Sequence, residues 1–126
     1  MQRFWITILL FSTLSLDIAA QQTEPSTALF ADCINHWYLT RQRGDYERYT
    51  PDQYIEIADN LLAYQNEDGG WSKNIDWLAK LDSKEVIDQL GSRARESTLD
   101  NRNIYPQCEF LAQVYAMCGD DKYKQA

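Results

Sequence analysis

Two polar clusters contain the side chains whose types and spacing suit chemistry. They are Gly69-Gly70-Trp71-Ser72-Lys73-Asn74 and Ser97-Thr98-Leu99-Asp100-Asn101-Arg102-Asn103. The oxygens of Asp100, Asn101 and Asn103 are hard ligands, which suit calcium better than zinc. Arg102 offers a planar fork for a carboxylate, and Lys73 offers a point charge for an anionic group. The residue types therefore indicate a site for a hard cation and an acidic substrate.

Each cluster also has a structural interpretation. Asp100 and Asn103 are suited to cap the helix that follows them. Trp71 either lines a sugar groove or plugs a junction between helices. The double glycine before it allows positive φ and a sharp exit from the preceding helix. Residue chemistry alone leaves both interpretations open.

Helices are predicted on both sides of the clusters. The clearest opens at Thr50, with Pro51 at the first helical position and Gln53 completing a capping box. It ends near Gln65, before the glycines. Its predicted buried stripe contains Tyr54, Ala58, Leu61 and Leu62. The clusters then fall in connectors between helices, where helical folds commonly build their sites.

Further helices complete an all-α fold class. One follows Ser26, with Phe30, Ile34 and Trp37 at helical spacing. A long helix is predicted over 105–117 and is stopped by Gly119. Its apolar residues form two adjacent stripes, one with Ile104, Cys108, Leu111, Tyr115 and Cys118 and one with Phe110, Val114 and Met117. A short helix is predicted over 84–90, and Asp120 caps another at the end of the chain.

Composition limits the function classes. The chain has 126 residues, enough for one domain, and a net charge of −7, which argues against nucleic acid as a partner. Cys108 and Cys118 would lie about 15 Å apart along one helix, too far for a disulfide. Cys33 could reach one of them only through the tertiary fold, which would leave at least one thiol unpaired; three buried free thiols are the favoured expectation. The sequence has no metal-type Cys/His spacing, and its single histidine, His36, is expected to be structural.

The first residues have the pattern of a secretory signal. Arg3 precedes an apolar run from Phe4 to Leu16, and Ala19 and Ala20 follow as small residues near a cleavage point. The run is too short to span a bilayer comfortably. Residues 1–20 are therefore predicted to be a signal peptide, and residues 21–126 a secreted or periplasmic protein with no stable membrane association. An uncleaved anchor is the alternative.

Two longer segments together resemble the pectate lyases of polysaccharide lyase family ten. They are "IADNLLAYQNEDGGWSKNID" and "STLDNRNIYPQCEFLAQVYAMCGDDKYKQA". The family typically shows ADN-LL-YQ…NGGWPKN, then T-I/L-D-N, then FLA-VY…GD-KY. The resemblance covers residues 57–126. The sequence departs from it at Ser72, where proline is usual, and at Arg102-Asn103-Ile104, where many members have Gly-Ala-Thr.

The resemblance implies calcium-dependent β-elimination in α-1,4-polygalacturonate, the backbone of pectin, on an all-α toroid. Calcium would bridge protein and uronate carboxylates and acidify the C5 proton, which a base removes as the 4-linked sugar leaves. Residues 21–126 would then be the N-terminal portion of this catalytic domain. The chain would be inactive alone, because the family's catalytic arginine is expected beyond residue 126. Asp100 is carried over to the metal site, and the substrate contacts carried over are Lys73, Asn74, Asn101, Arg102 and Trp71.

Two other classes compete with this interpretation. Gln65 followed by Gly69-Gly70-Trp71 resembles the glutamine-tryptophan repeat of terpene cyclases, in which these residues tie helices together and do no chemistry. That alternative explains the first cluster but not the second. The remaining class is a carbohydrate-binding fragment without catalysis.

The leader gives a direct prediction. Expression in an exporting host should yield a protein that begins near Gln21, because small residues precede the predicted cleavage point. Mass spectrometry of the recovered protein measures this start. An intact Met1 in a membrane fraction would contradict the signal peptide.

Overall fold

The computed structural model describes residues 24–40, 46–80, 97–100 and 102–126. The predicted leader and the predicted helix over 84–90 lie outside these ranges. Within them the regular elements are η1 (Thr27–Phe30), α1 (Ala31–Thr40), α2 (Tyr54–Ala63), α4 (Tyr105–Cys118) and α5 (Lys122–Gln125). The described part contains no strand, only an isolated antiparallel bridge between Arg48 and Ala79. The helical fold class is confirmed for these residues.

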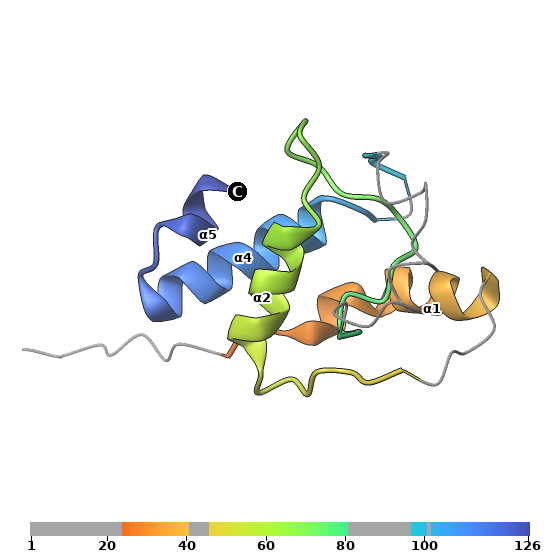
Figure 1. Ribbon diagram of the computed structural model, residues 1–126, viewed down its shortest axis with the longest axis horizontal. Coiled ribbons are helices and arrows are strands. Elements are labelled where there is room, and N and C mark those ends of the chain that lie inside the picture. Colours follow the sequence, from red (N-terminus) through yellow and green to blue (C-terminus); the bar gives the residue numbers. More distant parts are fainter. Residues whose placement is uncertain (1–23, 41–45, 81–96, 101) are drawn as a thin grey trace, which may run out of the picture.

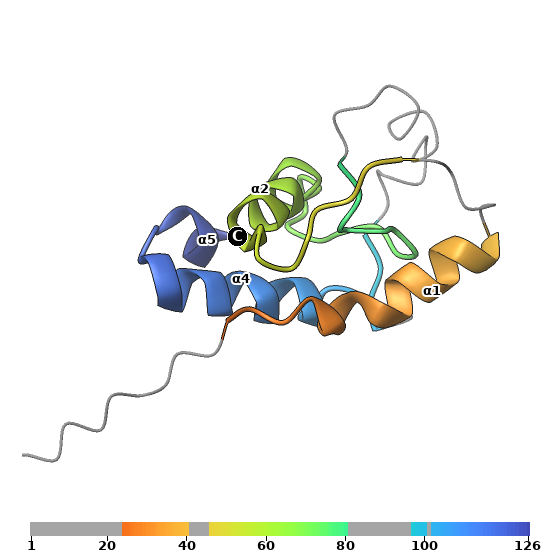
Figure 2. The ribbon, with the colours of Figure 1, turned by 90° about the horizontal axis from the view of Figure 1, so that it is seen from below.

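Helices α2 and α5 and the short helix η1 pack against α4, whereas α1 packs against η1. Helix α2 lies across α4, and α5 folds back along its C-terminal end (Figure 1). From below, η1 lies beside α4 and α1 continues away from it (Figure 2). The rings of Phe30 and Phe110 pack with centroids 5.1 Å apart and join η1 to α4. No helix of the described ranges has the length and apolar character that a membrane crossing needs.

Helix α2 begins later than predicted. Its first residue is Tyr54 and Gln53 stands at the N-cap, because the backbone N–H of Gln53 donates to the Thr50 carbonyl and closes a separate turn. Half of the expected capping box is present, since the Thr50 N–H donates to Gln53 Oε1 at 3.0 Å. The Thr50 hydroxyl also bonds that oxygen, so it does not cap the helix. The helix ends at Ala63, close to the predicted end.

Helix α4 has the predicted bounds but a narrower buried face. Gly119 closes it in the left-handed conformation, with φ 70°, as expected. The side chains of Phe110, Leu111 and Val114 are buried. Cys108 and Cys118 are exposed, so the first predicted stripe is wrong at these two positions.

A buried carboxylate holds the irregular segment that follows the first cluster. Asp76 is 1% exposed, and Arg48 Nε lies 2.9 Å from its Oδ2. The hydroxyls of Tyr46 and Tyr38 donate to the same oxygen at 3.0 and 3.4 Å, and the Leu78 N–H donates to Oδ1. Burial and the Asp76 charge raise the pKa of Tyr46. The segment before α2 is thereby fixed to the segment after it.

The three thiols should differ sharply in reactivity. Burial raises the pKa of Cys33 to about 11, so its thiolate is scarce, whereas Cys108 and Cys118 are exposed. At mildly alkaline pH, a disulfide-exchange reagent is expected to modify two thiols quickly and the third only after unfolding in denaturant. Peptide mapping should identify the protected thiol as Cys33. Three equally fast thiols in the native protein would contradict this packing.

Candidate functional site

The two glycines after α2 serve different physical needs. Gly69 has φ 82°, a conformation that L side chains rarely adopt, and the space around its α-carbon is open. A Cβ on Gly70 would instead lie 2.7 Å from both Cβ and Oγ of Ser97. The first glycine therefore turns the chain, and the second lets the first cluster approach the second.

Hydrogen bonds hold this approach. Ser97 Oγ accepts from Asn66 Nδ2 at 2.8 Å and donates to Asp68 Oδ1 at 2.5 Å. Asp68 Oδ1 also accepts the Gly70 N–H at 3.0 Å. The Ser97 bond, with help from the Gly70 N–H, lowers the pKa of Asp68. The predicted clusters are thus neighbours in space.

Trp71 is a packing residue in this structure. Its side chain is fully buried, and Nε1 donates to the Leu61 carbonyl at 2.7 Å, which satisfies a carbonyl near the end of α2. A buried ring cannot line a groove, so the proposed sugar contact of Trp71 is corrected to the structural interpretation. Ser72 beside it is 2% exposed, and its hydroxyl has no hydrogen-bond partner within the described residues.

Asn103 also has a different role from the two that the sequence left open. Its Nδ2 donates to the carbonyls of Trp71 at 2.5 Å and Thr98 at 2.7 Å, and its Oδ1 accepts from Gln107 Nε2 at 2.7 Å. The side chain is 1% exposed. Asn103 is therefore neither an open calcium ligand nor a side-chain cap of α4. It joins both clusters to the first turn of α4.

Lys73 and Asp100 form an ion pair on the exposed side of this junction. Lys73 Nζ contacts Asp100 Oδ2, and the two side chains are 41% and 59% exposed. The Asp100 N–H donates to Thr98 Oγ1 at 3.1 Å, which shapes the loop around the carboxylate. The structure thus brings together one predicted metal ligand and one predicted substrate contact, both accessible from solvent.

The remaining predicted substrate contacts, Asn74, Arg102 and Asn101, are not part of the Lys73–Asp100 ion pair. Asn74 is half-buried with φ 59°, and Arg102 is exposed with φ 51°. Asn101 lies outside the described residues. His36 Nδ1, as an N–H, donates to the Asp32 carbonyl 2.9 Å away on its own helix, which fits the expected structural role. No local pattern indicates the linking role of Asn103, because that role depends on the carbonyl of Trp71, 32 positions away.

The fit of this region to calcium is partial. Asp100 supplies an exposed carboxylate, which is a suitable hard ligand. In the described ranges, no group of three or more His, Cys, Asp or Glu side chains is arranged to hold a metal ion. Asp100 can therefore be one ligand of a calcium ion whose other ligands come from water, from a substrate carboxylate or from other residues. Such an ion would compete with Lys73 for the same carboxylate.

The comparison with protein families bears directly on this region. Residues 65–126 match the family model described as pectic acid lyase. The match covers slightly less than half of the chain, and it shows what this segment is similar to. The matched range contains both clusters, their Lys73–Asp100 junction and all of α4, so the resemblance is confirmed over the part that carries the site. Searches of curated proteins and of solved structures found no match.

Gln65 and Trp71 do join helix ends, as the terpene-cyclase alternative expected of them. Gln65 Nε2 donates to the Gly69 carbonyl at 2.9 Å and to the Ala126 carbonyl at 2.8 Å. With the Trp71–Leu61 bond, these contacts tie the end of α2 to its surroundings. A glutamine and a tryptophan therefore join helix ends within the segment that matches the pectic acid lyase family model.

Substitutions in the second cluster should separate stability from binding chemistry. Asn103→Asp is expected to destabilise the fold by about 1–3 kcal/mol or more, because the carbonyls of Trp71 and Thr98 lose their buried donor. Asp100→Asn should change stability by less than about 1 kcal/mol, since its ion pair is exposed. Urea unfolding followed by circular dichroism measures both. Equal effects would mean that Asn103 does not join the clusters as described.

Proposed function

We propose that this chain contributes the calcium- and substrate-binding part of a pectate lyase that cleaves α-1,4-polygalacturonate by β-elimination. The supporting observation is the pectic acid lyase segment, within which the fold places Lys73 beside Asp100. The proposed whole domain is a helical toroid that acts on pectin outside the cytoplasm, secreted or periplasmic. Its catalytic base is an arginine outside this chain.

The exposed ion pair suits an acidic polymer. Lys73 presents a flexible ammonium group that can turn from Asp100 to a uronate carboxylate. Asp100 can then offer its carboxylate oxygens to a hard cation. Bound calcium would supply Lewis acidity at the uronate carboxylate. The protein's part is to hold the uronate in place and to balance its charge.

The charge balance explains why substrate and cation should bind together. A uronate alone would approach a Lys73 that is already neutralised by Asp100, and a cation alone would have to displace that ammonium. When both arrive, each of the two side chains obtains a partner of opposite charge. Polygalacturonate and calcium are therefore proposed to raise each other's affinity, which is a reciprocal coupling.

The rigid surroundings support this role. Asn103 and Gly70 fix the two loops against each other, while the ends of Lys73 and Asp100 stay exposed. A site whose backbone is held by buried contacts positions its polar groups with little loss of entropy on binding. The exposed junction is thus the place where the described residues can accept an anionic sugar.

Calcium-dependent binding and cleavage test the proposal. In calorimetry with the full chain, oligogalacturonate should bind more tightly with calcium than with a chelator, and Asp100→Ala should remove that difference. For cleavage, residues 65–126 can replace the matching segment of an active pectic acid lyase. The chimera should form the unsaturated, ultraviolet-absorbing product, and Asp100→Ala should lower its rate by at least about a hundredfold.

The matched control is Asp121→Ala, which removes an exposed carboxylate at α5 that makes no side-chain cap bond. It should leave calcium-dependent binding and cleavage nearly unchanged. Cleavage by the Asp100→Ala chimera at the parent rate, with only an altered melting temperature, would reduce Asp100 to a structural residue. Calcium-dependent binding without cleavage by a folded parent chimera would favour the non-catalytic carbohydrate-binding alternative.

A further inference from the structure

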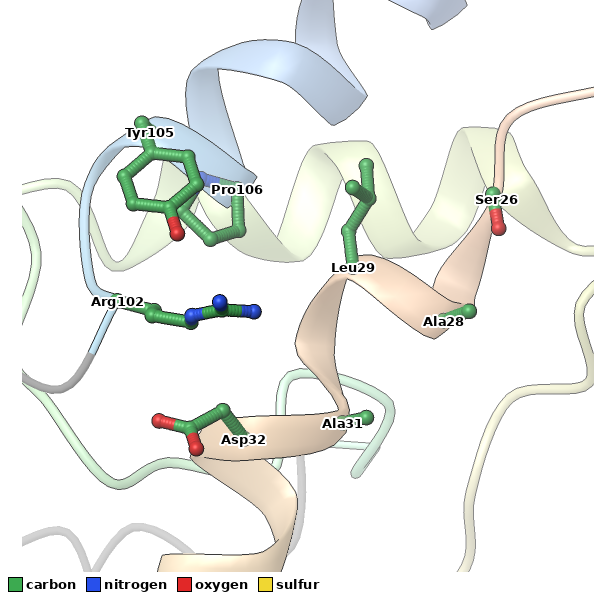
Figure 3. Close-up of a pocket in the computed structure, with 8 residues that line it drawn as sticks. All are labelled: Ser26, Ala28, Leu29, Ala31, Asp32, Arg102, Tyr105 and Pro106. Carbon is green, nitrogen blue, oxygen red and sulfur yellow. The ribbon is translucent and has the colours of Figure 1, made fainter.

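Arg102 lines a pocket to which neither Lys73 nor Asp100 contributes. This pocket of about 270 Å³ opens between the start of α1 and the loop that leads into α4. Figure 3 shows Arg102 extending into it between Tyr105 and Pro106 on one side and Asp32 on the other. Ser26 and Leu29 line the η1 side. The pocket is large enough for one sugar ring and combines cationic, anionic and aromatic groups.

Arg102 occupies this place in an unfavourable backbone conformation. Its φ of 51° lies in the left-handed region, which favours glycine over residues with a Cβ. Among the described residues, no hydrogen bond or ion pair with the guanidinium compensates for this conformation, and the side chain is exposed. Strained backbone conformations persist where the surrounding structure holds them, and they cluster at active sites and ligand clamps. An unpaired guanidinium in a pocket is suited to bind a carboxylate through two parallel hydrogen bonds.

The walls complement the rest of a uronate ring. Tyr105 is 54% exposed although it begins α4, and with the half-buried Leu29 it offers apolar surface for the C–H face of a sugar. Asp32 provides acceptor oxygens for sugar hydroxyls. Its Oδ2 lies 3.6 Å from His36 Nδ1, and it forms no ion pair with Arg102 in the described structure. The guanidinium therefore stays available to an anionic ligand.

We propose that this pocket is a subsite for one uronate unit of an acidic polysaccharide, separate from the Lys73–Asp100 pair. Arg102 binds the uronate carboxylate, Tyr105 contacts the ring, and Asp32 accepts its hydroxyls. The choice of galacturonate as the uronate rests on the proposed function. The binding itself requires no metal, because the charge partner is a guanidinium.

The test uses the full chain and trigalacturonate in the presence of a chelator. Titration followed by nuclear magnetic resonance should shift the signals of Ser26, Leu29, Asp32 and Tyr105. The fully methyl-esterified trimer keeps the sugar rings but lacks the negative charges. It should bind at least about tenfold more weakly, since the charge-assisted contacts to Arg102 are lost.

Variants of the pocket separate binding from folding. Arg102→Gly should raise the Kd for the trimer at least about tenfold while keeping or increasing the melting temperature, because glycine suits φ 51°. Arg102→Lys should give a smaller loss, since it keeps the charge but not the fork. The control Lys124→Ala removes one positive charge on α5 and should leave the Kd within about twofold.

The outcomes distinguish this subsite from the proposed function. Shifts confined to Lys73 and Thr98, with an unchanged Kd for Arg102→Gly, would overturn the subsite and leave the lyase proposal in place. No trimer binding in the chelator would also overturn the subsite, and cleavage by the chimera would then decide the lyase proposal independently. Shifts at the pocket in an inactive chimera would support the subsite and contradict the lyase.

Discussion

The side-chain amide of Asn103 is the interaction on which the arrangement of the site depends. It donates to carbonyls of Trp71 and Thr98, two loops that meet only in the folded protein, and it accepts from Gln107 in α4. The bonds to the Trp71 carbonyl and from Gln107 are buried, so moving the amide would take these partners away from polar groups that water does not reach. The ion pair of Lys73 and Asp100 can remain exposed because its loops are fixed from beneath.

Close backbone contact supplies the second constraint. Gly70 lies so near Ser97 that a side chain cannot be placed there without moving the second loop. Trp71 then fills the space under the turn and satisfies the end of α2. Within this short segment, residues 70 and 71 are buried and stabilise the fold, whereas the side chain of residue 73 is exposed to solvent.

The sequence predicted the features that depend on local rules. The bounds of α4, its glycine stop and the end of α2 follow from capping and helical spacing, and the structure agrees. The exposure of Cys108 and Cys118 did not follow, because apolar spacing does not tell which side of a helix has a neighbour. Asn103 and Asp76 were missed as structural anchors for a similar reason. Their partners come from distant segments, and a polar residue in a loop gives no sign of where its hydrogen bonds will go.

The Asp76 cluster also bears on how the chain assembles. The bond from Arg48 to Asp76 spans 28 positions and encloses α2 between the two segments that it joins, with backbone bonds from Tyr49 and Lys80 beside it. The entropy cost of closing a loop rises only slowly with its length, and contacts between residues close in sequence form quickly. The contacts that close the stretch from 46 to 80 on itself therefore need no residue of α4. The later arrival of Asn103 would then dock a finished unit rather than organise a disordered one.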